Sequence, residues 1–177
     1  MSAKTIVVTG IPGSGSTEFC EKYLDILAER DIRGSYYNVA DAILRMAQVP
    51  QWPPIGAENL LNLHPDFLNA LSGRAFDGII SDVRYDNPGQ RLVVDTHGQF
   101  FWNDVLTNAS NWRYIADLGP DLLITVIDKP SEIKARQLTT KQGRSQDHNW
   151  RDLLLWQNVE VNTTMGWAEH IGIPMYV

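Results

Sequence analysis

The segment GIPGSGST, at residues 10–17, has the residue types and spacing of a loop that binds the phosphates of a nucleotide. In the usual pattern, Gly-x-x-x-x-Gly-Lys-Ser/Thr, the glycines let backbone N–H groups face the phosphates, the lysine reaches the β and γ phosphates, and the hydroxyl holds magnesium. A strand-like run at 5–9 precedes the segment and an amphipathic stretch at 18–30 follows it. This context favours binding of the phosphates of a nucleotide, with a plain glycine-rich turn as the alternative.

Ser16 stands where the usual pattern has lysine, whereas Gly10, Gly15 and Thr17 fit it. A helix N-terminus has free N–H groups and a favourable dipole, so it attracts an anion without the lysine. Nucleotide binding should therefore survive this replacement more easily than catalysis. The residues expected to surround the nucleotide phosphates are Gly10, Gly13, Ser14, Gly15, Ser16 and Thr17.

A second candidate group is the carboxylate of Asp95, at the end of the apolar run 91–95. A strand ending beside the glycine loop would place this carboxylate where it can hold magnesium together with Thr17, directly or through water. The alternative is that Asp95 caps a following helix. His97 has no metal-ligand spacing to the other histidines, and we expect a structural or supporting role for it.

Four basic residues follow the expected strand at 122–127. Arg136 and Arg144 are the better candidates for stabilising charge on a transferring phosphoryl group, because a guanidinium fork matches phosphate geometry. Lys134 and Lys141 fit a solvated helix face almost as well. We expect the two arginines to belong to a lid that closes over the nucleotide and excludes water.

Six tryptophans are many for a chain of 177 residues. Trp156 and Trp167 lie in a helical stretch and are expected in the hydrophobic core. Trp52 and Trp102 lie near expected loops, where an indole ring can stack on a base.

The composition limits the class of protein. The chain is 44% hydrophobic, which is enough for one domain, residues 1–177, with a substantial core. A net charge of −6 argues against a nucleic-acid partner, and no stretch is long enough to span a membrane. The only cysteine, Cys20, excludes an internal disulfide and suits a packed thiol. We therefore expect a cytoplasmic protein without a signal peptide, whose partners are a nucleotide and a small-molecule acceptor.

Apolar runs suited to buried parallel strands alternate with helical patterns along the chain, which predicts a doubly wound α/β fold. Helices are expected at 18–30, 41–47 and 57–77, with a proline-rich loop at 50–54 before the third of them. The expected strands are Thr5 to Thr9, Ser35 to Val39, Arg91 to Asp95, Leu122 to Ile127 and Pro174 to Val177.

The last of these strands, 174–177, comes at the end of the sequence. A parallel strand normally has helices over both of its faces. We therefore expect either a covering helix beyond the sequence or an exposed strand that relies on a partner, such as a second copy of the chain.

Four segments, taken in order, resemble the archaeal-type adenylate kinases of the nucleoside monophosphate kinase group: residues 10–17, 37–41, 93–97 and 119–124. The resemblance implies a P-loop NTPase-like three-layer fold with a five-stranded parallel sheet, a lid and a helical acceptor-binding excursion. It also implies transfer of the γ phosphoryl from MgATP to a nucleoside monophosphate or a related acceptor.

The chain departs from that family in the acceptor half. Residues 61–65, LNLHP, stand where the family places an Arg-Lys-Leu-like segment, so the arginine expected to hold the acceptor phosphate is missing. Residues 98–103, GQFFWN, replace a proline- and glycine-rich acceptor loop, and Glu160-Val161 replaces an Asn-Arg pair. The residues from Phe100 to Asn103 suit a ring with a few polar groups, such as a nucleoside, as well as they suit hydrophobic packing.

Two functions are compatible with these residues. In a kinase, the loop N–H groups hold the donor phosphates, Thr17 and Asp95 hold magnesium, and Arg136 and Arg144 neutralise the transferring group. Asp41 or Asp95 would then orient an acceptor hydroxyl. In a nucleotide-binding regulatory module with little turnover, nucleotide occupancy would order the lid and signal to a partner. Asp95 and the expected lid arginines favour the kinase, whereas the missing loop lysine and acceptor arginines favour the module.

Overall fold

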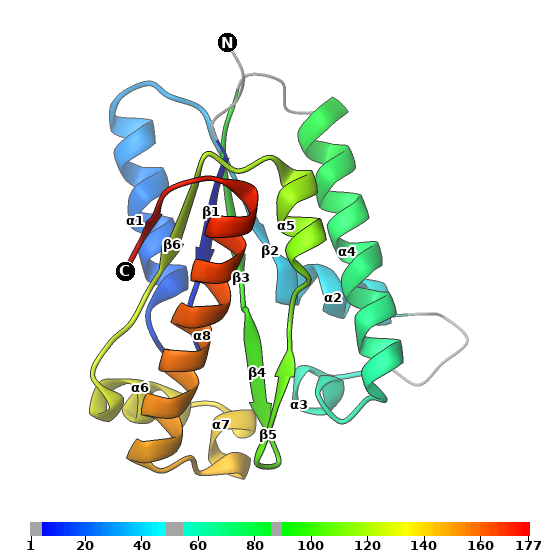
Figure 1. Cartoon of the computed structure of the whole chain (residues 1–177), viewed down its shortest axis with the longest axis vertical. Coiled ribbons are helices and arrows are strands. Elements are labelled where there is room, and N and C mark those ends of the chain that lie inside the picture. The colour runs from blue at the N-terminus through cyan, green and yellow to red at the C-terminus, as the bar shows by residue number, and fades with distance from the viewer. Residues whose placement is uncertain (1–4, 49–54, 86–89) are drawn as a thin grey trace.

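Five parallel strands form the centre of the fold (Figure 1). The computed structural model describes residues 5–48, 55–85 and 90–177. The strand order β2-β3-β1-β6-β7 places the glycine-loop strand in the middle of the sheet. All five strands were expected from the sequence, and their ends differ from the expected ones by at most two residues. They are β1 (Thr5–Thr9), β2 (Gly34–Asn38), β3 (Arg91–Thr96), β6 (Leu122–Thr125) and β7 (Met175–Tyr176).

Helices cover both faces of this sheet because the buried strand residues alternate between them. Val8 and Val93 pack with Cys20 of α1 (Ser16–Glu29) on one face. Val7 and Val94 pack on the other face against a larger cluster from α2, α4, α5 and α8. The chain is therefore an α/β protein with three layers, as expected, and the arrangement is that of a P-loop NTPase-like fold.

The remaining helices lie mainly between the strands in sequence. They are α2 (Val39–Ala47), α3 (Ala57–Leu60), α4 (Pro65–Tyr85), α5 (Trp112–Leu118), α6 (Pro130–Gln137), α7 (Lys141–Gln146) and α8 (Trp150–Ile171). The expected single helix at 57–77 is wrong, because two helices occupy this region. Pro65 has no N–H to donate to the preceding turn, so it begins a new helix instead of continuing the first.

A second, two-stranded sheet was not expected. β4 (Gln99–Trp102) and β5 (Val105–Asn108) pair antiparallel as a hairpin. The two residues between them, Asn103 and Asp104, have positive φ angles of 50° and 60°. This conformation matches the twist of the strands, and Asn and Asp tolerate it better than most residues.

Several expectations about packing are confirmed. Trp156 and Trp167 are buried in the core, and Cys20 is fully buried. Burial, more than the nearby carboxylates, raises the pKa of the Cys20 thiol, which keeps it protonated and inert. Trp52 lies outside the described residues.

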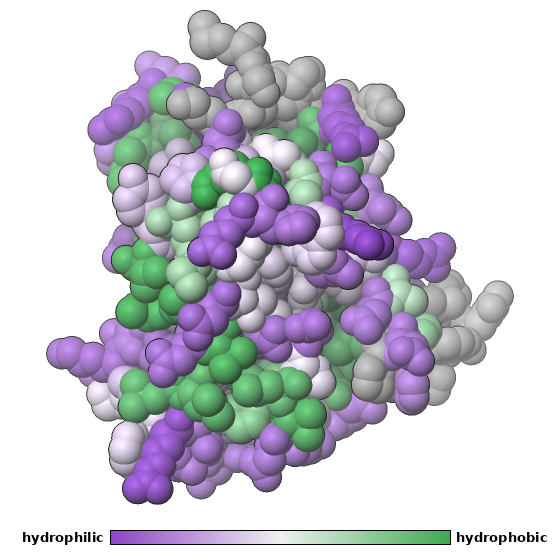
Figure 2. All heavy atoms as spheres, viewed as in Figure 1, coloured by the Kyte–Doolittle hydropathy of each residue, from purple (hydrophilic) through white to green (hydrophobic). Residues whose placement is uncertain are grey.

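The surface has two apolar features. Tyr176 of the edge strand β7 and the following Val177 are each 65% exposed. Figure 2 shows apolar surface over the lower half of the molecule, around α8, where Leu154 and Leu155 are 39% and 49% exposed. Within the described part of the chain, no helix combines the length and apolar character needed to cross a membrane.

Candidate functional site

The carboxyl ends of β1, β2 and β3 meet at one edge of the sheet. Val8 pairs with Asp95, and Asn38 pairs with the same aspartate from the other side. This register brings together the ends of β2 and β3 and the glycine loop that follows Thr9. Ligands of open α/β sheets bind at this carboxyl edge. A cavity of about 520 Å³ opens at this edge. In Figure 1, α3, α6, α7 and the β4–β5 hairpin gather around the same end of the molecule.

The glycine loop, residues 10–17, has backbone geometry that requires its glycines. Gly13 and Gly15 have φ angles of +87° and +96°, a region that residues with a Cβ rarely adopt. Gly15 is the N-cap of α1, and its carbonyl accepts the Phe19 N–H at 2.9 Å. The first N–H groups of α1 therefore lack partners within the helix and are available to an anion.

Two serines of the loop are buried. Ser16, the first residue of α1, is 7% exposed and lines the cavity. The Ser14 hydroxyl is buried and has no hydrogen-bond partner among the described residues. An unsatisfied buried hydroxyl costs free energy, so a ligand oxygen at the loop would relieve it.

Asp95 is the most connected polar side chain at the site. It is 3% exposed, and its Oδ2 accepts hydrogen bonds from Thr17 Oγ1 at 3.1 Å, Tyr36 OH at 3.0 Å and Asn38 Nδ2 at 3.4 Å. Burial, and then the Asp95 charge, raise the pKa of the Tyr36 phenol, so Tyr36 stays a donor. The alternative that Asp95 caps a helix is wrong, because β3 continues to Thr96 and a hairpin follows.

The second carboxylate oxygen of Asp95, Oδ1, is buried and has no hydrogen-bond partner among the described residues. Carboxylate and hydroxyl oxygens are ligands that Mg2+ prefers, and Mg2+ commonly takes only one or two protein groups beside phosphates and water. Asp95 and Thr17 therefore fit a magnesium ion. The described residues contain no cluster of three or more His, Cys, Asp or Glu side chains suited to a metal.

The two candidate arginines have different surroundings. Arg136 lines the cavity, donates from Nη1 to the Gly13 carbonyl at 2.6 Å, and forms a 2.8 Å ion pair with Asp128. The Lys129 backbone N–H, followed by Arg136, lowers the pKa of the Asp128 carboxyl. Arg144 donates instead to the carbonyls at 138 and 139, and it is not a lining residue. The structure thus brings Arg136, but not Arg144, to the loop.

The other basic candidates lie on the surface. Lys134 forms a 3.0 Å ion pair with Asp147, and their side chains are 38% and 73% exposed. Lys141 is exposed and does not line the cavity. Their positions agree with the solvated-face interpretation.

His97 supports the glycine loop from the end of β3. Its Nδ1 lies 2.5 Å from the Gly10 carbonyl oxygen. Because a carbonyl only accepts, Nδ1 carries the proton in this contact. Sequence reasoning expected a structural or supporting role for His97, and this contact agrees with it.

Sequence reasoning missed several polar groups that position the site. Glu160 of α8 is 1% exposed and accepts the N–H groups of Gly98 and Gln99 at 2.7 and 2.8 Å. Burial raises the pKa of its carboxyl. Gln137 Nε2 donates to the carbonyl of Pro12 at 2.7 Å and so holds the glycine loop from α6. The sequence feature that could have identified Glu160 is its position, as an acidic residue, on the inward face of an amphipathic helix.

The end of the cavity away from the glycine loop is apolar. Trp102 of β4 lines it and donates its indole N–H to Asn62 Oδ1 at 2.9 Å. Between this end and the glycine loop lies an aromatic wall, in which Phe101, packed in one cluster with Ile11, stacks on His148 with ring centroids 5.0 Å apart. The other residues that line the apolar end include Leu44, Leu60, Leu61 and Phe100.

Comparison with known proteins adds to this geometry. The chain is 26% identical over 169 residues to an adenylate kinase from Methanococcus aeolicus, and the match covers 93% of this chain and 80% of that protein. It also resembles the crystal structure of APE1195, with a TM-score of 0.51 and 19% identity over 84% of this chain and 75% of that one. No protein-family model matches the chain. The first similarity supports a nucleotide kinase-like P-loop protein, and the second bears on the fold alone.

Proposed function

We propose that this protein is a phosphotransferase similar to adenylate kinases, which binds ATP with Mg2+ at residues 10–17 and transfers the γ phosphoryl to an acceptor in the same cavity. The similarity to an adenylate kinase over 93% of the chain supports this reaction class. The glycine loop at the start of α1 supports the position of the donor.

The observation that carries the proposal is the pair formed by Thr17 and Asp95. The hydroxyl donates to one oxygen of the carboxylate at 3.1 Å, and the other oxygen is buried without a partner among the described residues. These two side chains would hold the magnesium ion. When bound, the ion would neutralise charge on the donor phosphates.

The protein groups around the loop have separate tasks in this proposal. The N–H groups that begin α1 hold the donor phosphates, and the buried hydroxyls of Ser14 and Ser16 add donors where the usual lysine is missing. Arg136, already at the Gly13 carbonyl, is the residue that neutralises the transferring phosphoryl group. Arg144 could contribute only after releasing the carbonyls that it binds.

A nucleotide-binding module with little turnover is the second candidate. It is favoured by Ser16 in place of lysine, and by the fact that Arg136 is already engaged by Gly13 and Asp128. In that case nucleotide would bind without producing phosphorylated acceptor.

The experiment is an assay of ADP and phosphorylated product from MgATP across nucleoside monophosphates and nucleosides. The phosphotransferase is expected to turn over at least one acceptor, and Asp95→Asn should lower that rate by about a hundredfold. Asp77→Asn, at an exposed aspartate on α4, is the matched control and should keep the rate. Binding of ATP without turnover of any acceptor would favour the module instead.

A further inference from the structure

The apolar end of the cavity offers a phosphate no arginine or lysine side chain from the described residues. Among the described residues that line the cavity, Arg136 is the only arginine or lysine. Its guanidinium contacts Gly13 and Asp128, at the loop end. A phosphate on a molecule in the apolar end would therefore have no cation beside it.

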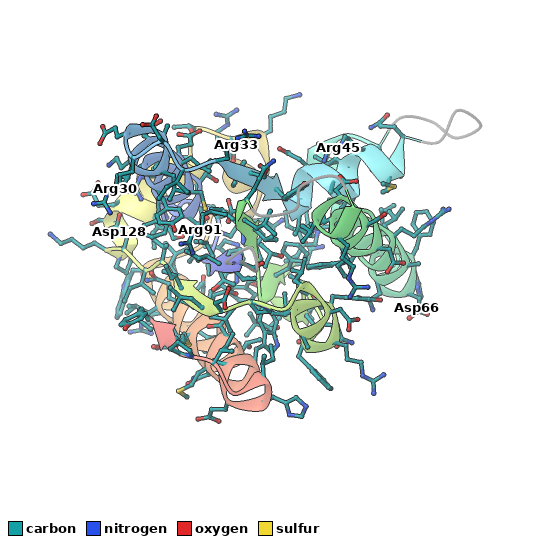
Figure 3. The ribbon with its side chains drawn as sticks, turned by 90° about the horizontal axis from the view of Figure 1, so that it is seen from above. Arg30, Arg33, Arg45, Asp66, Arg91 and Asp128 are labelled. Atoms are coloured by element: carbon teal, nitrogen blue, oxygen red, sulfur yellow. The ribbon has the colours of Figure 1, made fainter. Side chains whose placement is uncertain are left out.

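Four other arginines lie away from the cavity. Arg30, Arg33 and Arg91 lie at the amino edge of the sheet, at the end of α1 and the starts of β2 and β3 (Figure 3). Arg45 of α2 is exposed and lies at the rim of the molecule in the same view. Residues 49–54, VPQWPP, which fall outside the described ranges, contain neither arginine nor lysine.

Among the described residues, two of the three Asp, Glu, Arg or Lys side chains that line the cavity are carboxylates. Asp95 and Glu18 line the same cavity, and Asp95 is buried. A phosphate carried into this space would lose its hydration and face these carboxylates without compensation. Such a buried, unpaired charge is strongly disfavoured.

The same end suits an uncharged ring. The Trp102 indole is held by its hydrogen bond to Asn62, from the segment between α3 and α4, so its ring plane is fixed before a ligand arrives. Phe100 and the leucines of α2 and α3 supply apolar walls. Asn38 also lines the cavity. Its Nδ2 donates to Tyr36 OH and Asp95 Oδ2, so Asn38 offers a ligand only the remaining lone pair of Oδ1, which accepts. Fixed aromatic rings with few polar groups are typical of sites that bind a base.

We infer that the apolar end binds an uncharged nucleoside, and that it discriminates against the corresponding nucleoside monophosphate. This inference rests on the proposed function for the position of the donor phosphates. It differs from what similarity to an adenylate kinase would suggest, because the phosphate-binding cation is absent and an aromatic hairpin lines the space. The determinants are Leu61 and Trp102, together with the lack of a basic residue between them.

The test is equilibrium binding of nucleosides and their 5′-monophosphates, measured by calorimetry with and without the β,γ-imido analogue of ATP and Mg2+. At least one nucleoside should bind more tightly than its own monophosphate, by about tenfold or more. Trp102→Ala should weaken nucleoside binding by about tenfold and leave binding of the ATP analogue unchanged. Trp112→Ala, on α5 and outside the cavity, is the matched control.

A gain-of-function variant tests the missing cation directly. Leu61→Arg should raise the affinity for the monophosphate without raising that for the nucleoside, and so reduce or reverse the preference. Asn59→Arg places the same charge on an exposed position of α3 and should leave the preference unchanged.

The outcomes separate the inference from the proposed function. The inference is wrong if monophosphates bind as tightly as nucleosides. It is also wrong if the ATP analogue binds but neither nucleosides nor monophosphates do. Neither outcome bears against the proposed donor site. Failure of the ATP analogue to bind would overturn the proposed function. Even then, the affinities of a nucleoside and its monophosphate, measured without the ATP analogue, would test the inference.

Discussion

The two ends of the cavity are built in different ways. At the donor end, one continuous segment of eight residues supplies backbone N–H groups and hydroxyls, and its shape depends on glycine backbone angles. At the apolar end, side chains come from α2, α3 and the hairpin, which are far apart in the sequence. The donor end can be altered by changing one backbone angle, whereas the apolar end responds to the size and charge of individual side chains.

Because of this difference, substitutions can change the ligand of one end without changing that of the other. Backbone groups bind a phosphate whatever the nearby side chains are, so a loop can lose its lysine and keep its anion-binding geometry. A pocket made of side chains changes its ligand when a few residues change.

Gly15→Val should remove nucleotide binding at the donor end, lowering the affinity for ATP by about a hundredfold or more, because a branched side chain strains the φ of +96° and blocks close approach of a phosphate. Calorimetry with MgATP measures this. Gly119→Val has a comparable left-handed angle, +63°, at the end of α5 away from the cavity, and controls for the strain itself. If both variants bind ATP normally, residues 10–17 are only a turn.

Ser16→Lys should strengthen binding of a triphosphate more than binding of a monophosphate, because a charge-assisted hydrogen bond contributes about 1.5–3 kcal/mol. The effect should couple to Arg136→Ala by more than about 0.5 kcal/mol, and not to Arg144→Ala, because only Arg136 lies at the loop. The measurement is a pair of double-mutant cycles on ATP and AMP affinity. Additivity in both cycles, with no preference for the triphosphate, would place residue 16 away from the phosphates.

The donor half was predictable from the sequence because its information is local. Strand, loop and helix follow one another within residues 5–30, and an apolar run ending at Asp95 indicated the second part of the site. The structure brings Asp95 to Thr17 as that reasoning expected. The sequence did not separate Arg136 from Arg144, since both are basic residues near the same turn and only the fold decides which reaches Gly13.

The apolar half was less predictable because its contacts are long-range. The turn at Asn103 and Asp104 is a hairpin signal that the sequence contains, but the residues on either side were interpreted as a loop. Glu160 holds the start of that hairpin from α8, more than sixty positions further along the chain. Short-range patterns do not report such a contact.

The smallest predicted effect concerns pH and the aromatic wall between the two ends. Burial lowers the pKa of His148, which stacks on Phe101. Its native pKa lies below the unfolded value of about 6.5, so its contribution to stability is present above that value and is lost as the pH falls through the native pKa. His148→Phe should therefore lose less stability than the wild type between about pH 7.5 and pH 5.

Urea unfolding at the two pH values measures this difference. The exposed His64→Phe is the matched control and should keep the wild-type response. An unchanged response in His148→Phe would mean that protonation of His148 does not govern the stability of this wall.

The central claim is that residues 10–17, with Thr17 and Asp95, bind ATP with Mg2+, and thermal unfolding with and without MgATP tests it most directly. A ligand that binds only the folded state stabilises it by about 2.7 kcal/mol at a hundredfold excess over Kd, which raises the Tm of a domain of this size by about 5–10 °C. The shift should fall when EDTA removes the magnesium, and it should vanish in Gly15→Val. No change in Tm at millimolar MgATP would contradict the account.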